Sequence, residues 1–174
     1  MNPVTIMNLE TLNAAAAADA VATLSGIYEH SPWVAEAVVP QRPFASVEAL
    51  AQAMARAVAQ AGDGPQMALI RAHPQLAGKA AIAGELTASS TREQRGAGLD
   101  QCSPEEFLRL RQLNDAYQDR FGFPFILAVK GHSRDSILAN LAARLPNDAA
   151  TERAEALRQI DRIARFRLEA AFGG

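Results

Sequence analysis

The sequence predicts an all-α protein in which residues 1–174 form a single compact domain of about eight helices. Alanine, the residue with the highest helix propensity, supplies 37 of the 174 residues, and β-branched residues are few. Apolar residues recur along most of the chain at the three- and four-residue spacing of amphipathic helices. Because 49% of the residues are hydrophobic, the chain can bury a sizeable core, which excludes an intrinsically disordered protein.

Residues that favour helix starts divide the first half of the chain into four predicted helices. Asn13 is a cap near the start of the first, the pair Ser31-Pro32 precedes the second, and Ser46 caps the third. Pro65 opens the fourth, which ends near residue 73 because the following proline disfavours the α conformation there. These helices cover residues 9–28, 33–39, 47–61 and 67–72.

The second half carries further helix signals and one segment that looks extended. Ser90 and Glu93 have the spacing of a capping box, so a helix is predicted from Ser90 to about residue 98. Ser103 begins the next helix, and Gly122 ends it. The remaining expectations are a loop, a short helix or both over 78–88, an extended segment over 123–129, and helices over 133–145 and 149–172.

Composition excludes several classes of function. The formal net charge is −2, so no basic excess points to nucleic acid or to an anionic membrane. Cys102 is the only cysteine, and His30, His73 and His132 lie far apart, which argues against a disulfide scaffold and against a metal site. No apolar run is long enough to span a membrane, and no signal-peptide pattern is present. A cytoplasmic protein is therefore expected.

Arg167 breaks the pattern of the last predicted helix. It lies four residues after Ile163 and seven after Ile160, within the apolar stripe rather than opposite it. A charge on a buried face is costly unless it is paired. Arg167 is therefore either a structural residue, at the edge of the stripe or paired with a carboxylate, or an anion receptor beside a pocket.

Two other features allow both a structural and a functional interpretation. His73 has a side chain suited to general acid or base catalysis, although a single histidine is more often structural. Ser90 and Glu93 are explained by helix capping, but a helix N-terminus also binds anions, and Gln94 adds an amide there. The residues alone establish a small helical protein with a candidate anion site.

Several blocks of the sequence, spread over nearly the whole chain, resemble one family, the OHCU decarboxylases (2-oxo-4-hydroxy-4-carboxy-5-ureidoimidazoline decarboxylases). Each block is short, and their order and spacing together make the resemblance specific. The blocks are His30-Ser31-Pro32-Trp33-Val34, His73-Pro74-Gln75-Leu76-Ala77-Gly78, Ser90-Thr91-Arg92-Glu93-Gln94, Ala97-Gly98-Leu99, Leu113-Asn114 with Tyr117, Arg120-Phe121-Gly122-Phe123-Pro124-Phe125-Ile126, and Arg167-Leu168.

The resemblance implies an all-helical lyase, usually a homodimer, whose small-molecule substrate is OHCU. It implies the last step of urate breakdown in purine catabolism, a decarboxylation to (S)-allantoin without cofactor or metal. By position, His73 is the catalytic histidine, and Glu93 either polarises it or donates the proton itself. The implied substrate-binding residues are Pro74, Ser90, Thr91, Arg92, Gln94, Phe125, Ile126, Leu127, Ala128, Val129 and Arg167.

Two other functions stay open on the sequence. A related enzyme acting on another ureido compound would carry the same blocks. A non-catalytic helical interaction module is the alternative from a different class, and it predicts that His73 and Glu93 are dispensable. Binding of a flat, amide-rich ligand would distinguish a pocket from such a module, because a ligand that binds only the folded state raises the unfolding temperature.

Overall fold

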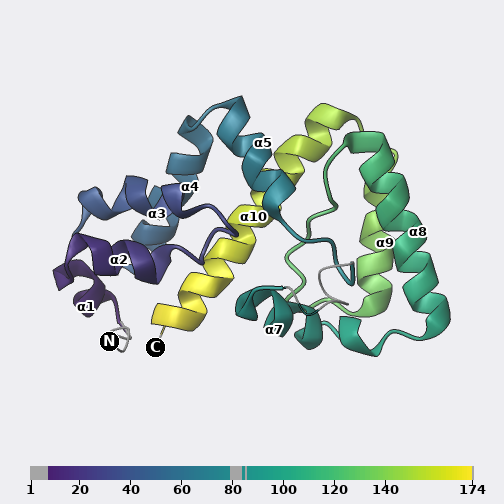
Figure 1. Ribbon diagram of the computed structural model, residues 1–174, viewed down its shortest axis with the longest axis horizontal. Coiled ribbons are helices and arrows are strands. Elements are labelled where there is room, and N and C mark those ends of the chain that lie inside the picture. Colours follow the sequence, from purple (N-terminus) through teal and green to yellow (C-terminus); the bar gives the residue numbers. More distant parts are fainter. Residues whose placement is uncertain (1–7, 79–83, 85, 174) are drawn as a thin grey trace. The chain divides into compact units, whose positions relative to one another are not determined.

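Helices account for the regular structure of the chain, as the sequence predicts. The computed structural model describes residues 8–78, 84 and 86–173. Within these residues there are nine α-helices, two short 3-10 helices and no β-strand, which confirms the all-α class (Figure 1). The predicted loop or short helix over 78–88 includes residues 79–83 and 85, which lie outside the described residues.

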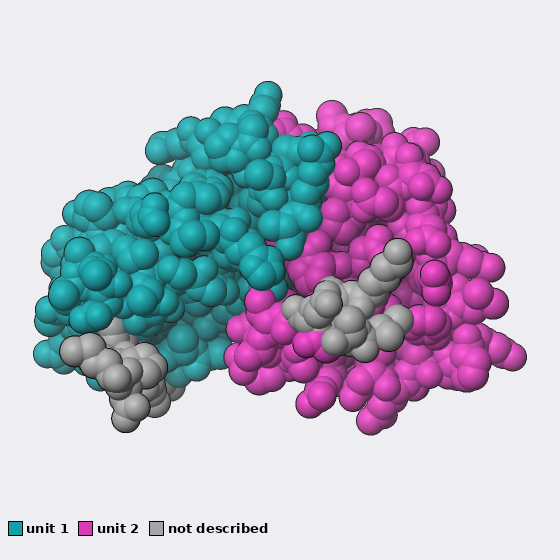
Figure 2. Space-filling view, in the orientation of Figure 1, with its two compact units in different colours: residues 1–72, 161–174 teal, residues 73–160 magenta. Residues whose placement is uncertain are grey.

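The chain divides into two compact units (Figure 2). The first unit contains the residues up to 72 together with those from 161 onward, and the second is the continuous stretch 73–160. The last helix, α10 (Ala149–Phe172), therefore gives its first half to the second unit and its second half to the first. Its bounds agree with the predicted helix over 149–172. That residues 1–174 form a single domain stays a prediction.

The first unit is a set of amphipathic helices around an apolar core. Besides the second half of α10, it contains α1 (Leu9–Ala14), α2 (Ala17–Leu24), α3 (Pro32–Val38), the 3-10 helix η1 (Val39–Gln41), α4 (Val47–Gln60) and α5 (Asp63–Ala72). Helix α3 packs against both α2 and α4. In α4, the four-residue spacing of Leu50, Met54 and Val58 places these buried side chains on one face.

The single helix predicted over residues 9–28 is wrong, because the chain forms two helices there. Arg42 accounts for the break between α1 and α2. Its Nη1 donates hydrogen bonds to the carbonyl oxygens of Leu12, at 2.8 Å, and Ala15, at 2.7 Å. A continuous helix would bind both oxygens to its own N–H groups four residues later. The arginine lies 27 residues beyond Ala15, so no local signal announces the break.

Two other helix starts in the first unit differ from the prediction. Asn8 caps α1, and Asn13 instead pairs with the backbone of Phe44. The Asn13 amide donates to the Phe44 carbonyl at 2.9 Å and accepts from its N–H at 2.8 Å. Helix α5 begins at residue 63 rather than 67, so Pro65 lies in the first turn, where a missing N–H costs no helical hydrogen bond.

In the second unit, helix signals close in sequence specify most helix ends. Besides the first half of α10, it contains α7 (Ala88–Gly96), the 3-10 helix η2 (Leu99–Gln101), α8 (Pro104–Phe121) and α9 (Arg134–Arg144). Helix α8 packs against α9, and α7 packs against η2. Ser103 and Glu106 form a capping box at the start of α8, and Gly122 ends that helix with a φ of +76°. Both ends of α8 confirm the prediction.

The predicted start of α7 at Ser90 is wrong by two residues. Thr87 is the N-cap, since its Oγ1 accepts a hydrogen bond from the backbone N–H of Ser90 at 3.1 Å. Threonine and serine are both good caps, and here the threonine lies three residues earlier in the chain. Ser90 consequently lies inside the first turn, and the capping box predicted for Ser90 and Glu93 is not the one that begins the helix.

Candidate active site

His73 is the first residue after α5, and a tight turn follows it. Pro74 disfavours a helical conformation at the preceding residue, so α5 ends at Ala72 as predicted. The side chain of His73 is buried. In the turn, Ala77 has a φ of +51°, in the left-handed region that alanine rarely adopts. Such a backbone persists only where neighbouring groups hold it in place.

Two buried amide side chains hold the turn that follows residue 73. Gln94 in α7 accepts from the N–H of Ala77 at 2.9 Å, and its Nε2 lies 3.5 Å from the carbonyl oxygen of Gln75. Asn114 in α8 donates to the carbonyl oxygen of Leu76 at 3.0 Å. The structure therefore brings the predicted site residue Gln94 to the turn that carries the histidine, and it adds Asn114 as a second support.

The other predicted site residues of α7 face several directions. Ser90 is buried on the same face as Gln94, four residues along the helix. Thr91 and Glu93 are half-buried, and the hydroxyl of Thr91 donates to a carbonyl oxygen one turn back at 2.9 Å. Arg92 is exposed, with its Nη2 3.4 Å from the hydroxyl of a serine three residues earlier. Arg92 is therefore the one predicted α7 residue whose side chain lies in solvent.

The predicted extended segment forms no helix, and residues 123–129 are all buried. Two side chains from neighbouring helices bind its backbone. Arg144 at the end of α9 donates from Nη1 to the carbonyl oxygen of Ile126 at 2.6 Å. Gln159 in α10 accepts from the N–H of Ala128 at 3.0 Å. These bonds account for two backbone groups that would otherwise be buried without a partner.

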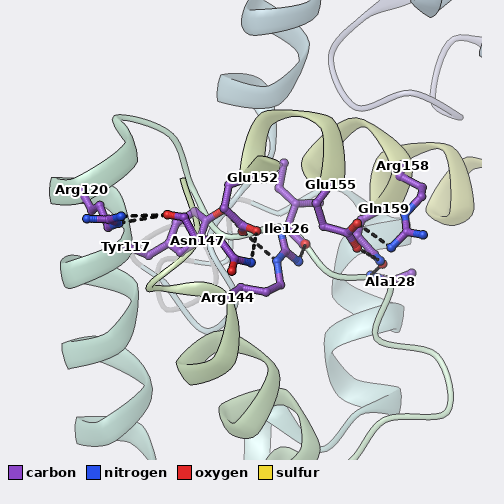
Figure 3. A network of polar contacts seen from close by, with 10 residues as sticks. All are labelled: Tyr117, Arg120, Ile126, Ala128, Arg144, Asn147, Glu152, Glu155, Arg158 and Gln159. Atoms are coloured by element: carbon purple, nitrogen blue, oxygen red, sulfur yellow. Dashed lines mark hydrogen bonds and ion pairs between the residues drawn. The ribbon is translucent and has the colours of Figure 1, made fainter. Parts of the chain in front are cut away.

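Glu152 is the centre of a buried polar network beside this segment (Figure 3). Its Oε1 accepts from Nε of Arg144 at 2.8 Å and from the hydroxyl of Tyr117 at 2.6 Å. Its Oε2 accepts from the amide of Asn147 at 3.1 Å. Burial, together with the hydrogen bond to Glu152, raises the pKa of Tyr117 well above its usual value, so the tyrosine stays a neutral donor.

Arg167 lies in the first unit, buried in the second half of α10. Its Nη1 is 2.8 Å from Oε2 of Glu29 and 3.3 Å from the carbonyl oxygens of Gly26 and Ile27. Glu29 is itself buried. Pairing with a carboxylate is the structural alternative that the sequence left open for this residue, and the geometry provides that carboxylate.

The described part of the chain contains no group of three or more histidine, cysteine, aspartate or glutamate side chains that could hold a metal ion. None of its helices combines the length and the apolar character that crossing a membrane requires.

Comparison with known proteins assigns the chain to a family. Residues 13–169 match the family model described as OHCU decarboxylase. The chain belongs to the OHCU decarboxylase family. The match includes the turn after His73, helix α7, the extended segment and Arg167, so the resemblance seen in the sequence blocks is confirmed at the level of the family.

Three members or neighbours of the OHCU decarboxylase family illustrate the similarity. The 2-oxo-4-hydroxy-4-carboxy-5-ureidoimidazoline decarboxylase of Haloferax volcanii is 43% identical over 146 residues, which are 84% of each chain. The uric acid degradation bifunctional protein of Bacillus sp. (strain TB-90) is 39% identical over 96% of this chain, which spans about a third (32%) of that protein. The crystal structure of (S)-allantoin synthase matches with a TM-score of 0.78 and 31% identity, over 95% of this chain and 54% of that one.

Sequence reasoning missed the polar residues that hold the extended segment of this chain. Glu152 and Gln159 lie four residues before and three residues after the buried Ala156, on the buried face of α10. The same spacing argument that singled out Arg167 would have found them. Arg144 gave no such signal, because a basic residue in the last turn of a helix is explained by the helix dipole.

Proposed function

We propose that this chain is a carboxy-lyase that converts OHCU into (S)-allantoin in urate breakdown, without a cofactor. The observation that carries the proposal is the family match over residues 13–169. Its support is the identity of 43% to a relative that bears the name of this decarboxylase and is of similar length. The bifunctional relative is named for uric acid degradation, the pathway that this reaction completes.

The proposed substrate carries its own electron sink. Its carboxylate is attached to a ring carbon that is bonded to a C=N carbon. When the bond to the carboxylate breaks and carbon dioxide leaves, the electron pair forms a C=C bond and the C=N pair moves to nitrogen, which takes up a proton. Transfer of the hydroxyl proton and protonation of the ureido-bearing carbon then give a carbonyl group and a new stereocentre. The chemistry therefore requires no external electron acceptor.

The protein then has three tasks in this reaction. It must hold the flat, amide-rich ring in one orientation. It must replace water around the carboxylate as the negative charge leaves that group. It must deliver a proton to one face of the enol, which determines the (S) configuration of the product. Each task depends on groups held rigidly before the substrate arrives.

We assign the proton chemistry to the turn after α5. His73 orients the carboxylate or the hydroxyl of the substrate and transfers a proton, and Glu93 either polarises His73 or donates the proton itself. Two hydrogen bonds support this assignment, because they fix the turn that carries the histidine: Gln94 accepts from the N–H of Ala77, and Asn114 donates to the carbonyl oxygen of Leu76. The predicted substrate-binding residues of α7 and the segment 125–129 complete the part of the proposed site that belongs to the second unit. Arg167 is proposed as a further substrate contact by its position in the family's sequence pattern.

A coupled assay tests the proposed reaction. Urate, urate oxidase and hydroxyisourate hydrolase generate the unstable substrate, and circular dichroism follows the chiral intermediate and product with and without the protein. Faster, stereospecific formation of (S)-allantoin supports the proposal. Decay at the spontaneous rate in the presence of folded protein overturns it, and a screen of other ureido compounds then tests whether a related substrate is used.

We also propose that the chain acts in the cytoplasm as a homodimer and that residues 1–174 form one functional domain. The family match supports the last point, because it runs through both compact units. Light scattering after size-exclusion chromatography measures the mass of the particle, and a monomer across the working concentration range would contradict the dimer. A single unfolding transition seen by both near- and far-ultraviolet circular dichroism is expected for one domain.

A further inference from the structure

The extended segment is anchored along one edge by side chains. Residues 126 and 128 supply the two backbone groups that these side chains bind, namely the carbonyl oxygen of Ile126 and the N–H of Ala128 (Figure 3). Their partners are a donor, Nη1 of Arg144, and an acceptor, Oε1 of Gln159. The two bonds lie on either side of one residue, Leu127.

This pattern is that of a neighbouring strand in a parallel sheet. In a parallel sheet, one residue of the neighbouring strand lies opposite residue i of the strand in question. Its N–H donates to the carbonyl oxygen of residue i−1, and its own carbonyl oxygen accepts from the N–H of residue i+1. Arg144 and Gln159 together make that pair of bonds around Leu127. Alternate residues of an extended chain present their N–H and C=O groups to opposite edges, so the backbone of Leu127 belongs to the other edge. Among the described residues, the N–H and C=O of Leu127 take part in no hydrogen bond.

The guanidinium of Arg144 has one orientation, because three further groups fix it. Its Nε is bound to the buried carboxylate of Glu152 at 2.8 Å, and Tyr117 donates to the same oxygen. The guanidinium carbon of Arg144, Cζ, lies 4.5 Å from the centre of the Phe125 ring. A buried ion pair is weak evidence for added stability, because apolar side chains of similar volume often fill such a space at lower free energy. An apolar pair would not bind the carbonyl of Ile126.

We propose that Arg144 and Gln159 are positioning residues for substrate binding. They occupy one edge of residues 126–128 and thereby direct the N–H and C=O of Leu127 toward the ring and ureido amides of the substrate. Neither side chain touches the substrate; each acts through the backbone that it holds. This inference rests on the proposed function, because it presupposes an amide-rich ligand of that kind.

Gln159→Met is the decisive variant, since methionine has a similar volume but no acceptor for the N–H of Ala128. Arg144→Lys is the second variant, because lysine keeps the charge beside Glu152 and lacks the fork that reaches Glu152 and Ile126 together. For each folded variant, the positioning role predicts that KM rises by about 10- to 100-fold while kcat changes much less. If Arg144 and Gln159 were purely structural, the substitutions would lower the fraction of folded, active enzyme. The apparent kcat would then fall while KM stayed constant.

Arg158→Gln is the matched control. Arg158 belongs to the same network through its ion pair with Glu155 (Figure 3), but its side chain is 71% exposed. The hydrogen bonds that hold residues 126 and 128 come instead from Arg144 and Gln159. The KM of the Arg158→Gln variant is expected to stay within about twofold of the KM of the wild-type protein. Hydrogen exchange adds a readout besides activity: the amide of Ala128 is expected to exchange faster in Gln159→Met and at the wild-type rate in Arg158→Gln.

The outcomes separate this inference from the proposed function. If the wild-type protein does not turn over the substrate, the proposed function fails and this inference fails with it. If the wild-type protein is active and folded Gln159→Met keeps the wild-type KM, the positioning role alone is overturned. If Arg144→Lys does not fold, Gln159→Met and the exchange of the Ala128 amide still decide the question.

Discussion

Arg167 and Glu29 form a buried ion pair between residues 138 positions apart in the sequence, with Nη1 of the arginine 2.8 Å from Oε2 of the glutamate. The same nitrogen lies 3.3 Å from the carbonyl oxygens of Gly26 and Ile27, in the first part of the loop that follows α2. Glu29 is 1% exposed and Arg167 is 9% exposed. The pair explains how an arginine is accommodated within the apolar stripe of α10.

Removing the carboxylate of this pair should destabilise the first unit. Glu29→Gln leaves the buried guanidinium without its counter-charge, so the free energy of unfolding is expected to fall by about 3 kcal/mol. Urea denaturation followed by circular dichroism measures the change. The double variant Glu29→Gln with Arg167→Met removes both charges and should recover much of the loss. A loss of stability in the double variant equal to that in Glu29→Gln would contradict this account.

The proposed substrate contact of Arg167 has a separate test. Arg167→Lys keeps a positive charge beside Glu29, but it loses the planar fork that binds a carboxylate or a carbonyl with two hydrogen bonds. If the fork binds substrate, KM is expected to rise about tenfold, the equivalent of about 1.4 kcal/mol. Steady-state kinetics of the coupled assay measure it. An unchanged KM would assign Arg167 a structural role alone.

His73 should be indispensable for the proposed reaction and not for folding. His73→Asn retains a polar side chain but cannot transfer a proton near neutral pH, so kcat is expected to fall by about 100-fold or more. His132→Asn is the matched control, because His132 is bound to Ser136, which lies in α9 and is not part of the predicted site. The control should keep near-wild-type turnover. Near-wild-type turnover in folded His73→Asn would remove His73 from the mechanism.

Asn114 should be required for the turn after His73. Asn114→Leu removes the donor to the Leu76 carbonyl and leaves that buried oxygen without its bond, so stability is expected to fall by about 1–2 kcal/mol. Activity should fall too, because the turn loses one of its two supports. Gln118→Leu, one helical turn later, is the control and should change stability by less than about 0.5 kcal/mol. Equal effects of the two substitutions in urea denaturation would refute the special role of Asn114.

Asp161 gives the pH dependence of stability a defined direction. Burial raises the pKa of this carboxyl above its ordinary value, although the hydrogen bond from Tyr28 acts in the opposite sense. Between the unfolded pKa of about 3.9 and the raised folded pKa, the folded protein binds more protons than the unfolded chain. The contribution of Asp161 to stability therefore falls as the pH rises through that window.

Asp161→Asn removes this titration while keeping an oxygen that accepts from Tyr28. The difference in unfolding temperature between the variant and the wild-type protein should shift in favour of the variant as the pH rises from about 4 to 7. Thermal unfolding at several pH values measures it. A difference that is constant over this range would mean that the folded and unfolded pKa values of Asp161 are the same.

Local chemistry accounts for the features that the sequence predicted well. The capping box of Ser103 and Glu106 and the glycine at 122 specify both ends of α8, because every interacting group lies within four residues. The start of α7 was mispredicted because two residues able to cap, Thr87 and Ser90, lie three positions apart. Sequence alone does not rank two such competing caps.

Long-range contacts account for the features that the sequence did not reveal. The break after α1 depends on Arg42, and the pairing of Asn13 depends on Phe44, 31 residues away. In the candidate site, Ile126 was identified by resemblance, but its partner Arg144 was not. The bond from Arg144 to Ile126 joins residues 18 apart, and only the packing of α9 and α10 against the segment brings such groups together.

The division of the chain between the two units determines when the contacts of each unit can form during synthesis. A ribosome completes the whole of the second unit before it adds the last helical turns of the first. Until residue 167 emerges, Glu29 lacks the arginine that neutralises it, so the nascent first unit cannot bury that carboxylate at low cost. The second unit has every one of its residues synthesised by position 160, seven positions before the arginine of the buried pair in the first unit is added.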